Sequence, residues 1–317
     1  MTSWPNHEGP WREWSSAINS ARMHHGWILA GKAGLGKFEF AMAAARQLVN
    51  EPGVPQPGEH PDIIEVTYGP KDKKAETARD NGKPFELARS LRVGQIREMQ
   101  KRLTTRPTLG MRRVLIINPA DDLETASSNA LLKSLEEPPR GSFFMLISHR
   151  PSRLLPTIRS RCRILRFPVL DEAQLTQMLT RDGQQADPLA VKAAGGSYGA
   201  ALRFSEEDLA PVVRVIEGLL SAGDTGFAAR SELSRLIGPR ADRGRVQAVF
   251  DLAQSITSAR AREASRASER NALVEAHSRL IALAGQAPTH NFDAGLLSLE
   301  IGTLLVSAHA ASEPAHG

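Results

Sequence analysis

The chain has 317 residues, 40 Lys plus Arg against 35 Asp plus Glu, and one cysteine. At roughly 100–200 residues per domain, this length predicts two or three domains with hydrophobic cores of their own. A single cysteine excludes a disulfide framework and any zinc site built from several cysteines, which favours an intracellular protein stabilised by packing. The formal net charge of +5 is modest for this length and indicates no particular partner.

The sequence contains no pattern typical of export or of a membrane span. Residues from Met1 to Trp11 include no apolar signal core. No later stretch approaches the roughly 20 consecutive apolar residues that a membrane helix needs. We therefore expect a soluble, cytoplasmic protein. All four tryptophans lie within the first 27 positions, and the sequence assigns no function to this grouping.

The part of the chain from Trp11 to about Phe167 alternates short apolar runs with helical patterns. This alternation is typical of an α/β domain with a mostly parallel sheet covered by helices. The stretch from Tyr68 to Lys83 is polar and lacks periodicity, which predicts an exposed loop or a partly disordered insertion. The expected strands are 26–30, 61–66, 113–117 and 143–147, and the expected helices are 38–49, 93–103 and 126–137.

After Pro168 the pattern becomes helical. Short helical patterns at 171–179, 188–194 and 200–204 predict a small helical domain, and four or five longer helices are expected from about Glu206 to Ala311. Glycines at 223, 238 and in the segment 285–288 separate these longer helices. The predicted domains are 1–167, 168–206 and 207–317.

The strongest local pattern is a glycine-rich loop between a predicted strand and a predicted helix. Gly31, Gly34 and Gly36 would let backbone N–H groups cradle phosphates, and Lys37 would reach the β and γ oxygens. The next position of such a loop should be Ser or Thr, which binds Mg²⁺, but here it is Phe38. Its bulk belongs in the core below the loop. A fortuitous turn is the alternative, and the position between strand and helix favours a phosphate-loop ancestry instead.

The predicted strand 113–117 is not followed by the metal-binding acid that an ATPase would have there. An ATPase of this type places Asp and then Glu after the strand, to hold the metal and polarise the attacking water. Here Asn118 stands at the metal position and Pro119 replaces the base. Asp121 and Asp122 are either displaced ligands or, more simply, caps of the following helix. Because both metal-handling positions are lost together, we expect a retired active site.

Two further segments carry a family resemblance. Asn129 to Pro139 reads NALLKSLEEPP, and Pro151 to Cys162 reads PSRLLPTIRSRC after an intervening strand. In this order after the phosphate loop, they resemble the clamp-loader branch of the AAA+ family. The resemblance covers the chain to about residue 205 and implies an AAA+ P-loop core, a small helical lid domain and an all-α C-terminal collar domain for oligomerisation.

In that family Ser-Arg-Cys is the arginine-finger motif, so the resemblance assigns the finger to Arg161, with Ser160 and Cys162 as the interface motif around it. A guanidinium that is always charged can enter a neighbouring subunit's nucleotide site and stabilise the transferred phosphoryl group. A single Arg in a basic loop would otherwise be a solvated charge or a salt bridge. The surrounding motif favours the finger, and the small side chain of Cys162 is expected to pack inward.

Departures from the motor subunits of the family favour a non-hydrolysing stator subunit. A motor would place a sensor arginine near Gly199 or Ala200, and Arg203 lies after that motif. The alternative is an ATP-hydrolysing motor subunit in which Asp121 or a water replaces the missing ligands. The intact loop leaves residual ATP binding open, although no cofactor is expected to be required. A direct DNA binder is a third possibility, without an aromatic-basic platform to support it.

The resemblance also implies partner subunits, and it shows that this chain lacks the zinc-binding cysteines common in the family. The partners would be gamma/tau-type ATPase subunits and a delta-type subunit of a DNA polymerase III clamp loader, reached through the collar and the Arg161 interface, and indirectly the sliding clamp and primed DNA. Family members commonly insert four zinc-binding cysteines where this chain has the proline-rich segment 49–62. His60 alone cannot form a tetrahedral site, so we expect no zinc.

Overall fold

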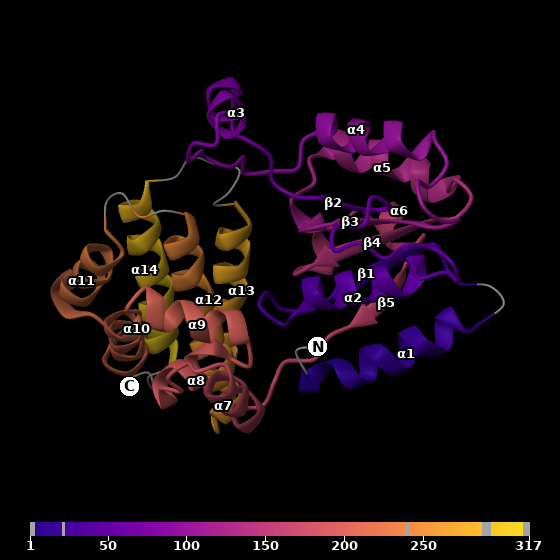
Figure 1. The fold of residues 1–317 in the computed structure, drawn as a ribbon. Helices are drawn as coiled ribbons and strands as arrows, with labels where there is room; N and C mark the ends of the chain where they lie inside the picture. Colours follow the sequence, from indigo (N-terminus) through magenta and orange to yellow (C-terminus); the bar gives the residue numbers. More distant parts are fainter. Residues whose placement is uncertain (1–3, 21–22, 239–240, 242, 287–292, 313–317) are drawn as a thin grey trace. The chain divides into compact units, whose positions relative to one another are not determined.

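The computed structural model describes residues 4–20, 23–238, 241, 243–286 and 293–312. The chain forms two compact units, Met1–Val169 and Leu170–Gly317 (Figure 1). This division lies close to the predicted boundary after Phe167. The further boundary predicted between residues 206 and 207 falls inside the second unit and stays a prediction.

The first unit contains a five-stranded sheet in the order β2-β3-β4-β1-β5. Every pair of neighbouring strands is parallel, so the prediction of an α/β fold with a mostly parallel sheet is confirmed. The fifth strand begins directly after the Ser-Arg-Cys motif and pairs with β1. The strands are β1 (Gly26–Ala30), β2 (Ile63–Val66), β3 (Arg113–Ile117), β4 (Ser142–Ser148) and β5 (Arg163–Arg166).

Helices cover both faces of this sheet, because side chains alternate between the faces along each strand. Trp27 and Leu29 of β1 lie in the core beneath α1 (Glu8–Ile18) and α2 (Lys37–Val49). Ile28 of the same strand points to the opposite core, beneath three other helices (Figure 1). Those helices are α4 (Val93–Leu103), α5 (Thr125–Glu136) and α6 (Pro156–Arg159).

The expectation of a loop or partly disordered insertion between Tyr68 and Lys83 is wrong. The segment contains the helix α3 (Lys73–Asp80), whose first turn is capped by Asp72: the Ala75 N–H donates to Asp72 Oδ1 over 2.9 Å. Ala75 is the one buried residue of this helix. A helix with so small an apolar face produces no hydrophobic periodicity, which is why the pattern did not predict it.

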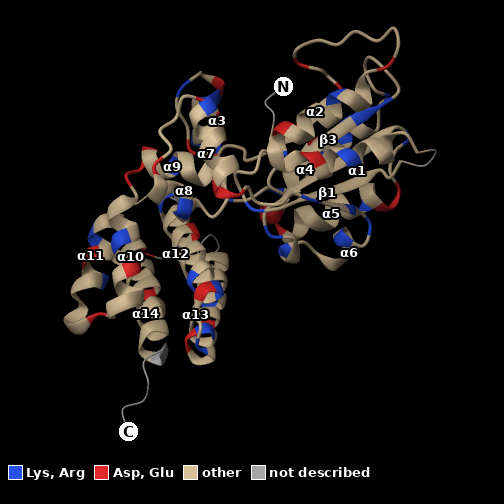
Figure 2. Cartoon of the chain, turned by 90° about the horizontal axis from the view of Figure 1, so that it is seen from below, with Lys and Arg blue, Asp and Glu red and all other residues tan. Residues whose placement is uncertain are grey.

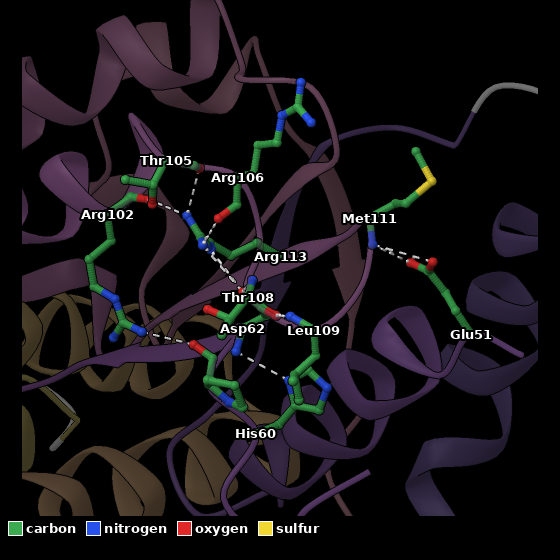
Figure 3. Close-up of polar contacts among 11 residues, drawn as sticks. Glu51, His60, Asp62, Arg102, Thr105, Arg106, Thr108, Leu109, Met111 and Arg113 are labelled. Atoms are coloured by element: carbon green, nitrogen blue, oxygen red, sulfur yellow. Dashed lines mark hydrogen bonds and ion pairs between the residues drawn. The ribbon is translucent and has the colours of Figure 1, made fainter. Parts of the chain in front are cut away.

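A buried ion pair fixes the connection between α4 and β3 (Figure 3). Arg113 Nη2 lies 3.3 Å from Asp62 Oδ1, and both side chains are almost fully buried. Asp62 also accepts the Thr108 and Leu109 N–H groups over 2.7 and 2.8 Å. Burial alone would raise the pKa of Asp62, but these two amides and the Arg113 guanidinium outweigh it and leave the pKa below its ordinary value.

The second unit is helical throughout its described part. It begins with α7 (Glu172–Arg181), α8 (Pro188–Ala194) and α9 (Tyr198–Glu206), as the sequence predicts. One hydrophobic core joins Ala190 and Phe204 of these helices to residues of the longer ones. The longer helices are α10 (Ala210–Ala222), α11 (Ala228–Ile237), α12 (Arg243–Glu263), α13 (Ala267–Gln286) and α14 (Ala294–Ser312).

The described residues therefore contain five long helices in this region, within the predicted number. Gly223 and Gly238 end α10 and α11 with φ values of 69° and 87°, which glycine adopts without strain. Gly285 lies inside α13, and residues 287 and 288 of the predicted break are outside the described part of the chain. Across the described residues, helices lack the combination of length and apolarity that crossing a membrane requires.

Candidate functional site: a phosphate loop and an arginine turn at opposite edges of one sheet

The glycine-rich loop follows the carboxyl end of β1 and leads into α2, as the sequence predicts. Gly34 and Gly36 have φ values of 74° and 72°, in the left-handed region that favours glycine. At Gly31 the requirement is space, because a Cβ there would lie 2.7 Å from the Phe167 carbonyl oxygen. These glycines bring the loop's backbone close to the start of a helix, the geometry by which such loops bind phosphate.

Lys37 is almost fully buried, and its ammonium turns back onto its own loop. The Nζ atom donates to the Gly31 carbonyl over 2.6 Å and to the Lys32 carbonyl over 2.5 Å. Burial lowers the pKa of Lys37 to about 8, although Asp121 and Glu39 act in the opposite direction. A phosphate would have to compete with two carbonyl oxygens for this ammonium.

The N-terminal segment lies on the outer side of the same loop. A Cβ on Gly36 would collide with the ring of Trp4, so the indole rests directly on this glycine. Trp4 stacks on His7 with a centroid distance of 5.3 Å, and His7 Nε2 donates to the Leu35 carbonyl over 2.8 Å. Burial lowers the pKa of His7. The positive charge of Lys37 acts in the same direction, whereas the hydrogen bond to the Leu35 carbonyl acts against it. This contact could not be predicted, because the glycine pattern of the loop carries no information on which residues cover it.

Three positions were expected to lack the metal ligands and the base that hydrolysis requires, and their side chains are apolar or neutral. Phe38 is partly buried against the core formed by α1, α2 and the sheet, as expected for its bulk. Asn118 is half-buried and its N–H donates to the Val66 carbonyl over 2.9 Å. Pro119 is buried, and the Asn118–Pro119 peptide bond is cis. None of these three side chains is a carboxylate or a hydroxyl.

The simpler interpretation of Asp121 and Asp122, as caps of the following helix, is wrong. Asp121 Oδ1 accepts the Ser148 hydroxyl over 2.7 Å, and its carboxylate also accepts the N–H groups of His149 and Arg150. Asp122 accepts the hydroxyl of Tyr68. Both carboxylates face the residues that follow β4 and β2, because the carboxyl ends of parallel strands meet at one edge of the sheet. Asp121 therefore binds the end of β4, close enough to Lys37 to raise its pKa.

His149 belongs to the same edge and was missed in the sequence. It follows β4 directly, and its Nδ1 is buried with no hydrogen-bond partner among the described residues. Burial lowers its pKa to about 4, with Lys37 acting in the same direction and Asp121 against it. Its position after the fourth predicted strand is the signal that could have placed it beside the phosphate loop.

Arg161 lies at the other edge of the sheet. Its Nη2 pairs with Glu136 Oε1 over 2.7 Å, and its Nη1 donates to the Thr157 carbonyl over 3.0 Å. The Ser160 hydroxyl donates to the same Thr157 carbonyl over 3.0 Å. The Arg161 side chain is about one-third exposed, so it remains accessible from outside.

Cys162 fixes this edge against β1. A Cβ on Gly26, the first residue of β1, would lie 3.0 Å from Cys162 Sγ and 3.1 Å from the Arg161 carbonyl oxygen. Cys162 is partly buried against the core beneath α4 and α5, and burial raises the pKa of its thiol to about 12. The expectation that this side chain packs inward is confirmed.

The two candidate sites are separated by the length of β1. The strand runs from Gly26, beside Cys162, to Ala30, which precedes the phosphate loop. At about 3.3 Å per residue, its two ends lie on the order of 13 Å apart. The structure therefore brings Lys37, Asp121 and His149 together at one edge and leaves Arg161 at the opposite one.

The segment expected to hold a sensor arginine, and the histidine of the proline-rich segment, have structural partners. Ser197 caps α9 by accepting the Ala200 N–H over 3.1 Å, and Arg203 pairs with Asp251 over 3.4 Å. His60 Nδ1 accepts the Asp62 N–H over 3.1 Å. The described part of the chain holds no group of three His, Cys, Asp or Glu side chains placed to bind a metal ion.

A parallel α/β sheet, a phosphate loop without its metal ligands and a Ser-Arg-Cys turn at the far edge define a P-loop protein of the clamp-loader type. The sequence of the first unit gives a narrower assignment. Residues 6–171 match the family model described as DNA polymerase III, delta subunit, and the chain belongs to this family. The predicted clamp-loader resemblance is thereby confirmed.

Two of the similar proteins are delta′ subunits. DNA polymerase III subunit delta′ of Pseudomonas aeruginosa is 33% identical over 187 residues, which cover 54% of this chain and 52% of that protein. The delta′ subunit of Escherichia coli is 30% identical over 209 residues, 61% of this chain and 58% of that protein. The chain thus spans little more than half the length of these relatives.

Two gamma-type proteins are also similar. DNA polymerase III subunit tau/gamma of Haemophilus influenzae is 29% identical over 217 residues, which cover 62% of this chain and 29% of that protein. A solved structure of a gamma subunit-related protein from Thermotoga maritima aligns with 95% of this chain and 100% of its own, at 19% identity and a TM-score of 0.43.

Proposed function

We propose that this chain is a non-hydrolysing stator subunit of a DNA polymerase III clamp loader, and that it supplies Arg161 in trans to the nucleotide site of a neighbouring ATPase subunit. The observation that carries this proposal is the position of Arg161 at the edge of the sheet opposite its own phosphate loop. A guanidinium on the order of 13 Å or more from its own loop is unable to reach phosphates bound there. Its partial exposure leaves it accessible to a nucleotide held by another subunit.

The chain's own loop supports a site without hydrolysis. Mg²⁺ would lack a hydroxyl at Phe38 and a carboxylate at Asn118, and Pro119 offers no base to an attacking water. Asp121, the nearest carboxylate, already accepts one hydroxyl and two amides. We therefore expect residual ATP binding at most, through Gly31, Gly34, Gly36 and Lys37, and no requirement for a cofactor or for zinc.

The partners follow from membership in the family and from similarity to delta′ and tau/gamma proteins. We propose that gamma/tau-type ATPase subunits and a delta-type subunit meet this chain through two surfaces, the Arg161 edge and the helices from residue 207 onward. In the resulting complex the sliding clamp would be loaded on primed DNA. The segment 168–206 would act as the helical lid, and 207–317 as the collar domain.

A second candidate is an ATP-hydrolysing motor subunit. The complete run from Gly31 to Lys37 and the similarity to tau/gamma proteins favour it. Phe38, Asn118 and Pro119 favour the stator instead.

Turnover of ATP by the purified chain separates these two functions. We expect release of inorganic phosphate with Mg²⁺ to equal that of a Lys37→Ala variant, which lacks the loop's ammonium. Hydrolysis by the wild-type chain that exceeds this variant would contradict the stator proposal, because only a working site would depend on Lys37. Using the variant as the baseline also removes the contribution of any contaminating ATPase.

A further inference from the structure

The segment 69–90, which we call the knob, is a small ordered structure inserted between β2 and α4. Two backbone hydrogen bonds close its base: the Lys71 N–H donates to the Glu86 carbonyl over 2.8 Å, and the Ala88 N–H donates to the Gly69 carbonyl over 2.7 Å. The helix α3 stands on this base, apart from the helices that cover the sheet (Figure 1).

The base of the knob is bound to the sheet's carboxyl edge. The Tyr68 hydroxyl donates to the carboxylate of Asp122, which follows β3. Arg92, at the start of α4, donates from Nη2 to the Lys71 carbonyl over 2.6 Å. These contacts hold the knob in a defined position on the first unit.

Most of the knob's surface is open to solvent. Its buried side chains are Ala75 and Ala88, which have little apolar area to contribute. Phe85 and Leu87 are 38% and 53% exposed, and both lie on the segment that returns from α3 to the base of the knob. An aromatic ring in such a position is available to stack on a partner.

In the knob the carboxylates all have partners, whereas some of the lysines form no ion pair with any described residue. The knob carries six Lys and Arg residues against four Asp and Glu residues, and both signs occur on α3 (Figure 2). Each of the four carboxylates has a partner inside the knob. Asp72 caps α3, Glu76 and Asp80 pair with Arg79 over 3.8 and 2.8 Å, and Glu86 pairs with Lys71 over 2.8 Å.

Three lysines of the knob take no part in these ion pairs. Lys73, Lys74 and Lys83 are exposed, and none of their ammonium groups forms an ion pair with a carboxylate in the described part of the chain. Lys73 and Lys74 also occupy the first turn of α3, where positive charge opposes the helix dipole and so does not stabilise the helix. Their unpaired charge complements a polyanion.

We propose that the knob binds single-stranded DNA, with Lys73, Lys74 and Lys83 contacting phosphates and a base stacking on Phe85. The choice of DNA among polyanions rests on the proposed function, in which the chain works beside primed DNA. A basic surface with an exposed aromatic ring is the combination by which single strands are bound without sequence preference. Leu87, two residues further along the chain and also exposed, would add apolar surface.

The test measures binding of a short fluorescein-labelled oligothymidylate to the full chain by fluorescence anisotropy. Each phosphate contact on a single strand contributes about 0.7 to the slope of log K against log salt, so loss of one contact weakens binding by about fivefold at 0.1 M salt. Replacing all three lysines by alanine should therefore weaken binding by about a hundredfold and reduce the salt slope by about 2. Phe85→Leu, which keeps an apolar side chain but no ring, should weaken binding by about fivefold or more.

A matched control removes three lysines elsewhere: Lys101→Ala, Lys133→Ala and Lys192→Ala together give the same change in net charge. The knob variant losing affinity while the control retains it supports the proposal. Equal losses in both, no saturable binding by the wild-type chain, or displacement of the probe by polyglutamate as readily as by unlabelled oligothymidylate would each overturn it.

Failure of this proposal is distinguishable from failure of the proposed function. Binding of the oligonucleotide is measured on the chain alone and does not involve Arg161 or a second subunit. A knob that binds no DNA would leave the trans action of Arg161 to be decided by its own experiment.

Discussion

Arg161 and Glu136 form an ion pair of 2.7 Å between the Ser-Arg-Cys turn and the end of α5. Both residues belong to the two segments that carry the family resemblance, and both side chains are partly exposed. The carboxylate neutralises the guanidinium that we propose as a finger. To act as a finger on a neighbouring nucleotide, Arg161 would have to exchange Glu136 for a phosphate.

This exchange predicts the effect of Glu136→Gln. An ion pair with this exposure contributes about 0–1 kcal/mol, so its removal should leave the chain's thermal stability nearly unchanged. The same change should raise Arg161-dependent ATP hydrolysis in the assembled complex by up to about fivefold, since the guanidinium no longer has to break an ion pair with a carboxylate. Glu137→Gln, one residue away, is the matched control. A rate below that of the wild type would show that Glu136 holds the finger in its active position instead.

The buried pair of Asp62 and Arg113 predicts a large effect on stability. Arg113→Met leaves the Asp62 carboxylate buried without its cation and should reduce the free energy of unfolding by about 3–5 kcal/mol. Denaturant unfolding of the full chain checks this value, with Glu98→Gln at the exposed Lys101–Glu98 pair as a control that should change little. Similar midpoints for the two variants would contradict the role given to the buried pair.

His149 predicts how stability depends on pH. Its pKa in the folded chain is about 4, below the ordinary value of 6.5, so the unfolded chain binds a proton more tightly between these values. The stabilising effect of a neutral His149 is therefore full above about pH 6.5 and is lost as the pH falls toward 4, by up to about 3 kcal/mol.

His149→Gln isolates this contribution, because glutamine does not titrate. Thermal melts of the wild-type chain and the variant at several pH values should converge as the pH falls from 6.5 to 4. A difference between them that is constant with pH would contradict the assignment. His7, whose pKa is also lowered by burial, remains in both proteins and cancels from the comparison.

The contact between Trp4 and Gly36 predicts the nucleotide affinity of the loop. A stacked aromatic pair contributes about 0.5–1.5 kcal/mol, so Trp4→Ala should make ATP binding about twofold to tenfold tighter if the indole must move aside. Equilibrium binding of a fluorescent ATP analogue measures this change, with Phe227→Ala in the second unit as a control for loss of an exposed ring. Unchanged or weaker binding by Trp4→Ala would show that the indole does not obstruct the loop.

The sheet and most helices were predictable because they bury regular apolar patterns. Apolar runs marked four of the five strands, and Ile96, Met99 and Leu103 of α4 are buried at the spacing that predicted this helix. The absence of a hydroxyl at Phe38 and of a carboxylate at Asn118 could also be read directly, since it depends on side-chain type alone.

Other features were not predictable, because their contacts join residues far apart in the sequence or bury too little. Trp4 lies on Gly36 through an N-terminal turn that no motif describes, and α3 buries a single alanine. Asp121 was interpreted as a local cap, whereas its partners Ser148 and His149 come from a neighbouring strand. Sequence spacing indicates local hydrogen bonds, and the order of strands in the sheet decides the distant ones.

Arg161→Ala in the assembled complex tests the finger directly, and its control is Arg140→Ala, which removes an exposed arginine of the same unit with the same change in charge. The measurement is ATP hydrolysis by a reconstituted complex in which the neighbouring subunit's site is the one active site. With Arg161→Ala, assembly by size-exclusion chromatography should be unchanged, while hydrolysis should fall by about 10³ or more, the effect of removing an arginine finger. Hydrolysis equal to that of the Arg140→Ala complex would contradict the trans action of Arg161.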